Sequence, residues 1–506
     1  MKKILIGLVV LVALGYAGFT YTAKQQNARP TPDLYYDYYK SHDTTPEGKV
    51  GVFLVGLDTG EDYEPEWWKN IYDHILHANI PWPGRIFAGM DGGVALTDPE
   101  KYWEYEEFEP TSLHDQFGNY DDIDGIPYIE KWRRGEVQWV PPGNRLYLDH
   151  GYFLYAGRKS GVPSAAGKNM GTAKAWYFGS GFKNHKVPHQ YQAARVFADA
   201  FGQLTDKYGD FPYHTADSMD PWEMHQELYA MLDGGVDTLV LASPMVTYSH
   251  YEEFEGCWRH MVELVHQWEN ERGNGKQIKI VMSPPMGHFP PMRAGFVHLL
   301  KDRLDTLPKD ARVKVAISVH GMPWAKFPHE AWLELSKPYL EPLQEDVEKL
   351  VASYDFPKSE IVVSQDHFAD PIWDPDEEYL STNRAYLEGH RDGYDYVVQQ
   401  PIEFYTENTD TMFSHAHHNY HHFDGYDVYE TVDYSDWDEP YVRYLDYKGT
   451  MTIYNGVMVG KYRHYIADSL AMAIDSILSK SDTMQKRAGE KAVEAAGDVD
   501  QVSALH

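Results

Sequence analysis

The stretch VKVAISVHGMP, at residues 313–323, carries the pattern that decides the fold. It is an apolar run of strand length that ends in a histidine and a glycine, with a proline two residues later. Such a run, rich in Val, Ala and Ile, is typical of a strand buried on both faces of a parallel sheet. Ligands of these sheets bind beyond the carboxyl ends of the strands, so His320 is either a packed structural side chain or part of a site.

Similar apolar runs recur along the chain and alternate with amphipathic helical segments. The runs lie at 49–60, 211–219, 235–245, 277–287, 359–368 and 393–404, and helical patterns separate them at 221–235, 255–271 and 338–354. Strands that alternate with helices predict an α/β fold whose parallel sheets are covered by helices on both faces. The runs form two sets, which predicts two similar halves with a ligand cleft between them.

The composition of the chain excludes some classes of partner and cofactor. Its 506 residues include 77 acidic and 45 basic ones, a formal charge of -32, and 14% of them are aromatic. Phosphate binding needs a basic face, so nucleic acid is excluded as a partner, whereas an acidic surface concentrates divalent cations. Cys257 is the only cysteine, which rules out an internal disulfide and a cysteine-held iron–sulfur cluster.

The ends of the chain and one long internal segment depart from the strand–helix pattern. Lys2 and Lys3 precede an apolar run, so residues 1–23 are predicted to be a signal anchor or a cleaved signal peptide, or else a buried N-terminal helix. The first two alternatives place the body outside the cytoplasm, as in a periplasmic protein. The predicted organisation is a linker at 24–47, an N-terminal half at 48–270 with an insertion at about 80–187, a C-terminal half at 271–480 and a mobile tail at 481–506.

A histidine-rich tract, TMFSHAHHNYHHFDGYD at residues 411–427, follows the last apolar run. A helix starting near Thr406 would align Asp410, Ser414 and His418 on one face, with His415 on the neighbouring stripe and His422 one turn further. Imidazoles and a carboxylate in line suit a borderline metal such as Fe, Co, Ni or Zn, although solvated surface tracts share this composition. Nucleophile elbows, P-loops and HExxH motifs are absent from the sequence.

The strand ends resemble the motifs of one family, ferrochelatase, which inserts ferrous iron into protoporphyrin. AISVHGMP at 316–323 resembles its Ser-Ala-His-Gly/Ser-Leu-Pro motif, and VVSQDHFADPIWDPDEEYL at 362–380 resembles its Gln-Ser-Arg-x-Gly-x-x-x-Trp-x-x-Pro segment. GYDYVVQQPIEFYTENTDTM at 393–412 is similar to Gly-x-x-x-Val-x-x-x-Pro-Ile-x-Phe-x-Ser-Asp-His-Ile-Glu-Thr-Leu. GVFLVGLDTG at 51–60 matches the opening segment, and 235–256 sits where the family has Pro-x-Tyr/Phe-Ser. These motif segments occur in the same order as in the family, over residues 48–60 and 205–480.

This resemblance implies two Rossmann-like halves that enclose a porphyrin cleft. It implies that His320 and Asp410 act across the macrocycle as metal ligands and proton acceptors. The implied metal ligands are His320, Asp410, Ser414, His415, His418 and His422, and the implied substrate-binding residues are Tyr248, Ser249, Pro285, Met286, Met322, Trp324, Gln365 and Trp373. Asp410 replaces the family glutamate, and Asp366 and His367 stand where the family has Ser-Arg.

The expected activity is insertion of Fe2+ or Co2+, as substrate and without a tightly bound cofactor, into a porphyrin-type tetrapyrrole of haem biosynthesis. Two alternatives remain open on the sequence. One is a non-catalytic extracytoplasmic protein that binds haem or metal on the same fold. The other is a metal-dependent enzyme of different chemistry.

Overall fold

A computed structural model describes most of the C-terminal four-fifths of the chain. The described residues are 43–56, 60–61, 137–140, 152–155, 186–217, 221–322, 331–366, 378–416 and 434–503, with the single positions 15, 18, 36, 39, 40, 134 and 374. Among them no helix is long and apolar enough to cross a membrane. The N-terminal apolar run and most of the predicted insertion lie outside these residues.

The chain divides into two compact units. One comprises Met1–Thr31, Asp62–Lys186 and Asp427–Val432, and the other comprises Pro32–Glu61, Val187–Tyr426 and Asp433–His506. In the first unit, β2 (Val137–Val140) pairs antiparallel with β3 (Tyr152–Tyr155). All the elements described below belong to the second unit.

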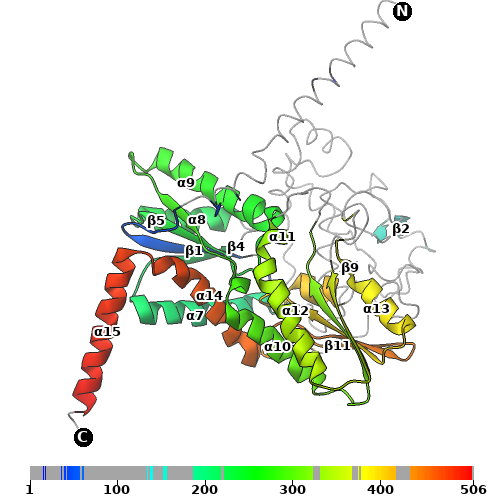
Figure 1. Ribbon diagram of the computed structural model, residues 1–506. Helices are drawn as coiled ribbons and strands as arrows, with labels where there is room; N and C mark the ends of the chain where they lie inside the picture. The colour runs from blue at the N-terminus through cyan, green and yellow to red at the C-terminus, as the bar shows by residue number, and fades with distance from the viewer. Residues whose placement is uncertain are drawn as a thin grey trace, which may run out of the picture. The chain divides into compact units, whose positions relative to one another are not determined.

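The first sheet of the second unit has four parallel strands. They are β1 (Val50–Gly56), β4 (Tyr213–Asp217), β5 (Thr238–Ala242) and β6 (Lys279–Met282), in the order β4-β1-β5-β6 (Figure 1). All seven residues of β1 are buried, as expected of a strand covered on both faces. Each strand falls within an apolar run of the sequence, so this part of the α/β prediction is confirmed.

The second sheet has six strands. They are β7 (Arg312–Val319), β8 (Lys358–Gln365), β9 (Leu380–Ser381), β10 (Tyr396–Pro401), β11 (Arg443–Tyr447) and β12 (Thr450–Tyr454), in the order β11-β12-β10-β7-β8-β9. In chain order β7, β8, β10 and β12 repeat the arrangement of β1, β4, β5 and β6, so the two sheets are similar halves. The change of sheet falls between Met282 and Arg312, later than residue 271, where the sequence predicts the second half to begin.

The edge hairpin of β11 and β12 is absent from the sequence prediction. These strands pair antiparallel around Lys448 and Gly449, whose φ angles are 53° and 92°. Two central residues with positive φ define the type of turn that suits a two-residue hairpin. The Lys-Gly pair between YLDY and TMTIY is the local signal for it.

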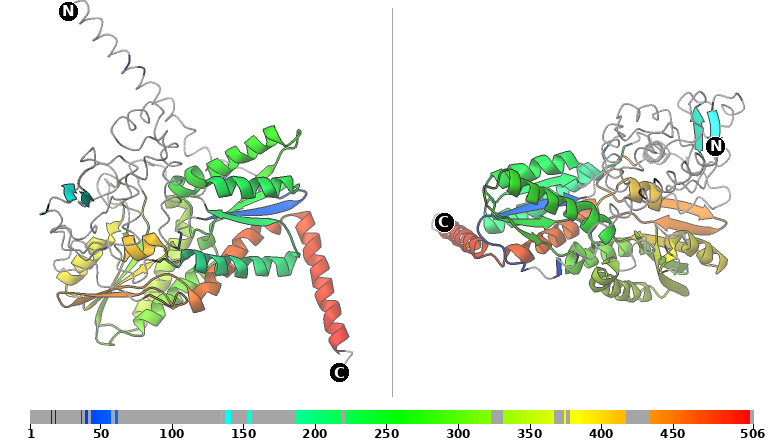
Figure 2. Two further views of the ribbon diagram at one scale, coloured as in Figure 1. Left: turned by 180° about the vertical axis from the view of Figure 1, so that it is seen from behind. Right: turned by 90° about the horizontal axis from the view of Figure 1, so that it is seen from above.

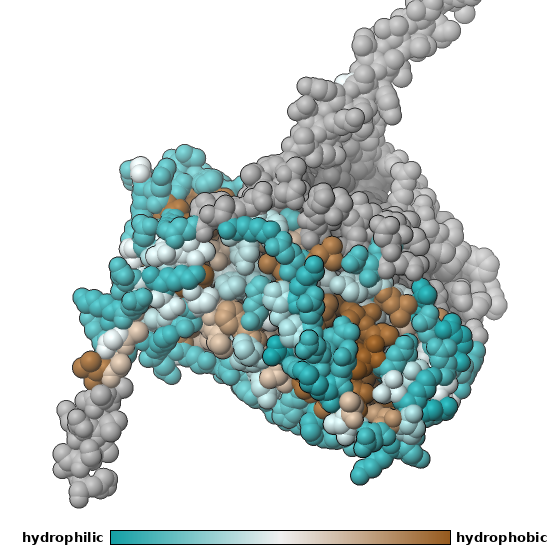
Figure 3. All heavy atoms as spheres, viewed as in Figure 1, coloured by the Kyte–Doolittle hydropathy of each residue, from teal (hydrophilic) through white to brown (hydrophobic). Residues whose placement is uncertain are grey.

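Helices cover both sheets (Figures 1 and 2). They are α7 (His189–Tyr208), α8 (Pro221–Asp233), α9 (Arg259–Glu271), α10 (Pro290–Leu304), α11 (Trp332–Leu335), α12 (Lys337–Ala352), α13 (Thr382–Arg391), α14 (Arg463–Leu478) and α15 (Asp482–Ser503), with the short 3-10 helices η3 (Met286–His288) and η6 (Gly460–Tyr462). In Figure 1, α8 and α9 lie on one side of the first sheet and α7 and α14 on the other. On the second sheet, α13 packs against β7, β8 and β10. The face in Figure 3 is mostly hydrophilic over the helices, in keeping with the acidic composition.

The C-terminal segment, predicted as a mobile polar tail, is helical in the structure. Residues 482–503 form α15, which packs against α7, and its Met484 is buried. The segment is rich in Ala, Glu, Lys and Gln, which have high helix propensities, so local preference and one apolar contact favour a helix here.

Two π-helices occupy equivalent places in the two halves. The first, η2 (His250–Trp258), follows β5, and the second, η4 (Asp410–His415), follows β10. β5 and β10 each lie third in their four-strand repeats. π-Helices are rare and occur frequently at functional sites, so the segments after these two strands are of particular interest.

Replacement of Leu54 by alanine tests the importance of the β1 core. Leu54 is fully buried in the strand between β4 and β5, so Leu54→Ala should lower the free energy of unfolding by about 2–5 kcal/mol. Val493→Ala on α15 is the control, because Val493 is 73% exposed and its loss should cost less than about 0.5 kcal/mol. Urea unfolding measures both, and equal losses would contradict the assigned core.

Candidate functional site

The segments after β7, β8 and β10 meet at one edge of the second sheet. β7 lies between β8 and β10, and all three are parallel, so their carboxyl ends coincide. His320 follows β7, Asp366 follows β8, and Glu403 comes two residues after β10. Gly321 has a φ of 86°, which an L side chain rarely adopts, so a glycine is needed directly after His320.

His320 is held by its main chain and by one ring nitrogen. Its backbone N–H donates to Glu403 Oε2 at 2.5 Å, and Trp332 Nε1 donates to Glu403 Oε1 at 2.5 Å. His320 Nδ1 lies 2.7 Å from the Gly321 carbonyl oxygen. A carbonyl only accepts, so Nδ1 carries the proton and the neutral ring has its lone pair on Nε2. Glu403 was not predicted; a carboxylate within the apolar PIEF segment was the available signal.

The carboxyl of Asp410 lies close enough to His320 for the histidine to affect its pKa. Burial raises the pKa of the Asp410 carboxyl, and the positive charge that His320 can carry lowers it. Asp410 keeps some exposed surface and begins η4. A carboxyl that is desolvated beside an imidazole is suited to accept a proton.

The helix after β10 differs from the predicted α-helix in a way that changes the site. In η4 the Ala416 N–H donates to the Thr411 carbonyl, five residues earlier, at 3.1 Å. Residue i+5 therefore lies roughly one turn beyond residue i, which brings His415 toward the face of Asp410. In an α-helix, with 3.6 residues per turn, His415 would point away from that face. The predicted alignment of Asp410 with Ser414 and His418 assumed α-helical spacing.

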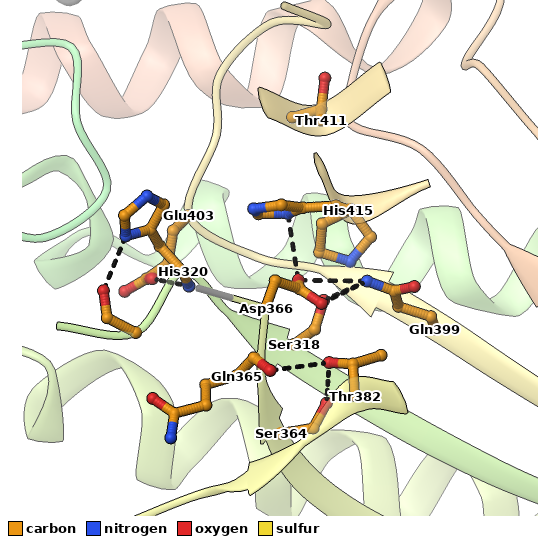
Figure 4. Close-up of polar contacts among 12 residues, drawn as sticks. Ser318, His320, Ser364, Gln365, Asp366, Thr382, Gln399, Glu403, Thr411 and His415 are labelled. Carbon is orange, nitrogen blue, oxygen red and sulfur yellow. Dashed lines mark hydrogen bonds and ion pairs between the residues drawn. The ribbon is translucent and has the colours of Figure 1, made fainter. Parts of the chain in front are cut away.

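His415 is 1% exposed and lies beside His320 (Figure 4). The centres of the two rings are 6.1 Å apart, and the Phe404 ring packs against both, at 5.8 Å from His320 and 5.0 Å from His415. His415 Nδ1 lies 3.0 Å from Asp366 Oδ2. The edge thus combines two imidazoles with the carboxyl of Asp410.

The predicted substrate-binding residues that the structure describes are packed in the interior. Tyr248, Ser249, Pro285, Met286, Met322 and Gln365 are all buried. The Tyr248 hydroxyl is 3.1 Å from Ser283 Oγ and donates to the Pro284 carbonyl at 3.2 Å, and its ring packs on Trp258. Tyr248 therefore has the surroundings of a core residue rather than of a ligand contact.

Several predicted site residues lie outside the described part of the chain. They are Trp324, Trp373, His418 and His422, and only the backbone of Ser414 is described. Among the described residues, no group of three or more His, Cys, Asp or Glu side chains could hold a metal ion by itself. The predicted set of metal ligands therefore stays a prediction.

Comparisons with known proteins do not assign a family to the chain. Neither a family model nor a curated protein matches it. Among solved structures, SirB from Bacillus subtilis with Fe3+ matches with a TM-score of 0.34 and 9% identity, over 57% of this chain and 89% of that chain.

Next to the site, Glu407 is a fully buried carboxyl whose ionisation is unfavourable. Glu407 Oε1 accepts the backbone N–H groups of Val457 at 2.8 Å and Tyr441 at 3.2 Å. Burial nevertheless dominates and raises the pKa of Glu407 to about 7. Between its ordinary value near 4.5 and 7, the folded protein binds more protons at this group than the unfolded chain does. This contribution to stability therefore falls as pH rises through that window.

Glu407→Gln should remove this dependence. Because a rise of the pKa to about 7 corresponds to roughly 3 kcal/mol, the variant should be more stable than the wild type at pH 8 by up to about that amount. The advantage should shrink as pH falls and vanish below about pH 4.5, where the group is protonated in both states. Urea unfolding across this range measures it, with Glu345→Gln on the exposed face of α12 as the control. A pH-independent difference would contradict the raised pKa.

Proposed function

We propose that the protein inserts a divalent metal, Fe2+ or Co2+, into a porphyrin-type tetrapyrrole. The observation that carries the proposal is that His320, at the carboxyl edge of a parallel sheet, acts electrostatically on the carboxyl of Asp410 and lowers its pKa against the effect of burial. The two residues are 90 positions apart in the chain, and the motif resemblance brings the same two positions together. The adjacent His415 adds a second imidazole to this edge.

Metal insertion requires groups that the edge supplies. The tetrapyrrole loses two pyrrole N–H protons as two nitrogen–metal bonds replace them, so one divalent cation enters for every two protons released. A neutral His320 can bind the cation or accept a proton through Nε2. Asp410 can accept the other proton, and its negative charge offsets that of the cation during transfer.

Asp410 replaces the family glutamate with a side chain one methylene shorter. The wider turn of η4 also changes which residues follow it on the same face. We propose that these two departures act together: the acid sits closer to the sheet edge, and His415 supplies the group that an acidic residue supplies in the family. The protein would then work with a more nitrogen-rich set of ligands, which suits borderline cations.

We also propose that the body works outside the cytoplasm, attached or exported through residues 1–23. The lysines before the apolar run support this orientation. A reporter fused to the C-terminus should be active only in an exported compartment. Full activity of a cytoplasm-restricted reporter would contradict the proposal.

The purified protein should metallate protoporphyrin when given Fe(II), Co(II) or Zn(II) under anaerobic conditions, as followed by its absorption spectrum. His320→Ala should abolish insertion, whereas His464→Ala, an exposed histidine on α14, should retain it. Full activity of His320→Ala would refute the assigned site. Tight haem or metal binding without insertion by the wild type would favour the non-catalytic carrier.

Asp410 is tested by two substitutions, one that keeps its size and one that keeps its charge. Asp410→Asn removes the proton acceptor and should lower the rate of insertion by about 100-fold or more, in line with the usual contribution of a general base. Asp410→Glu keeps the carboxylate and should retain much of the rate. Equal rates in wild type and Asp410→Asn would show that Asp410 is not the acceptor.

A further inference from the structure

We propose that Asp366 and Gln399 are positioning residues that make His415 a second nitrogen ligand for the substrate cation, beside His320. This inference rests on the proposed metal insertion and names residues that the motif resemblance leaves without a role. Asp366 stands where the family has Ser in Gln-Ser-Arg, and Gln399 lies inside strand β10.

Asp366 places a carboxyl group in the interior of the protein. Its side chain is fully buried, so its charge must be balanced by nearby donors. Gln399 Nε2 donates to both carboxylate oxygens, at 3.0 and 3.1 Å, and His415 Nδ1 is 3.0 Å from Oδ2. The described surroundings thus give Asp366 one amide donor and one imidazole partner.

Gln399 has little freedom to turn. The Tyr386 hydroxyl on α13 donates to its Oε1, and its Nε2 also contacts Ser318 Oγ on β7 at 3.0 Å. The amide therefore presents its NH2 group to Asp366, and the carboxylate is held between β8, β10 and η4 (Figure 4). Groups anchored on strands hold a site more exactly than groups on loops.

The carboxylate decides which nitrogen of His415 is available. A lone pair on Nδ1 would face the Asp366 oxygen at 3.0 Å, so this contact favours the tautomer with its proton on Nδ1 and its lone pair on Nε2. Figure 4 shows the second ring nitrogen of His415 on the side of the ring that faces His320. His320 has the same arrangement, with Nδ1 held by the Gly321 carbonyl. Metal-binding histidines commonly have such a carboxylate or carbonyl partner on the other nitrogen.

The separation of the two rings suits one cation. An imidazole nitrogen binds its metal at about 2 Å, which places the metal roughly 3 Å from the ring centre. Two rings whose centres are 6.1 Å apart are therefore close enough to share one ion if both Nε2 atoms face it from nearly opposite sides, or to pass it from one to the other. If two residues bind the cation, its other coordination positions remain open to water and to the tetrapyrrole nitrogens. Open positions are needed because the cation must be released to the tetrapyrrole.

The experiment uses Co(II) as the probe, without tetrapyrrole, on the full chain. Wild type should bind Co(II) with visible absorption bands typical of nitrogen ligands. Asp366→Asn should weaken Co(II) affinity by about 10–100-fold and shift these bands, because His415 then faces a neutral amide instead of a carboxylate. His415→Gln, which can still donate to Asp366, should weaken binding at least as much. Asp395→Asn, which removes the partner of Arg312 at the opposite end of β7, is the matched control and should bind as the wild type does.

A second measurement needs neither metal nor an Asp366 variant. Long-range proton–nitrogen NMR on protein labelled at histidine, with His415→Gln for assignment, reports which nitrogen of His415 carries the proton. The proton should be on Nδ1; a proton on Nε2 alone in the wild type would overturn the proposal, as would unchanged Co(II) binding by His415→Gln. If the wild type shows either of these two results but still inserts metal, the ligand assignment fails and the proposed function holds. Co(II) bound through both imidazoles without insertion would overturn the function and not the ligand assignment.

Discussion

Parallel pairing of β7 between β8 and β10 is the constraint on which the site depends. It brings the residues that follow three distant strands to one edge, where His320, Asp366 and Glu403 lie within reach of one another. The Glu403 carboxylate then ties the turn after β7 to the segment after β10 through the His320 N–H. Without that link, an apolar strand end would leave a backbone donor and the Trp332 N–H buried without an acceptor, which costs about 1–3 kcal/mol for each group.

Several buried carboxyl groups lie around this edge, and each has a different set of partners. Glu403 accepts hydrogen bonds from two N–H groups, one in the main chain of His320 and one in the side chain of Trp332. Asp366 is balanced by an amide and an imidazole. Glu407 accepts two backbone N–H groups, yet its pKa still rises to about 7. A charge left in a low-dielectric interior is expensive unless it is paired, so these side chains are better explained by positioning and proton handling than by stability.

The two halves share more than strand order. Each places a π-helix after the third strand of its four-strand repeat, and each π-helix contains a buried histidine: His250 and His415 are each 1% exposed. Local composition does not reveal this, because the difference between α and π spacing is a matter of hydrogen-bond register that packing selects. That is why α-helical periodicity aligned Asp410 with Ser414, whereas the structure turns His415 toward it.

The sequence by itself determined the α/β class, the positions of the buried strands and the location of His320 and Asp410 beyond strand ends. A strand that is buried on both faces has a continuous apolar run, and glycine and proline often follow it. Both features are local, so they can be recognised from the sequence without knowledge of the fold. The tertiary structure alone decided that Glu403 contacts His320 and Asp366 contacts His415, that residues 448–449 close an edge hairpin, and that Tyr248 is buried in the core. Those facts depend on which distant groups meet in the interior, where a buried polar group must find its partner, and no local pattern specifies that partner.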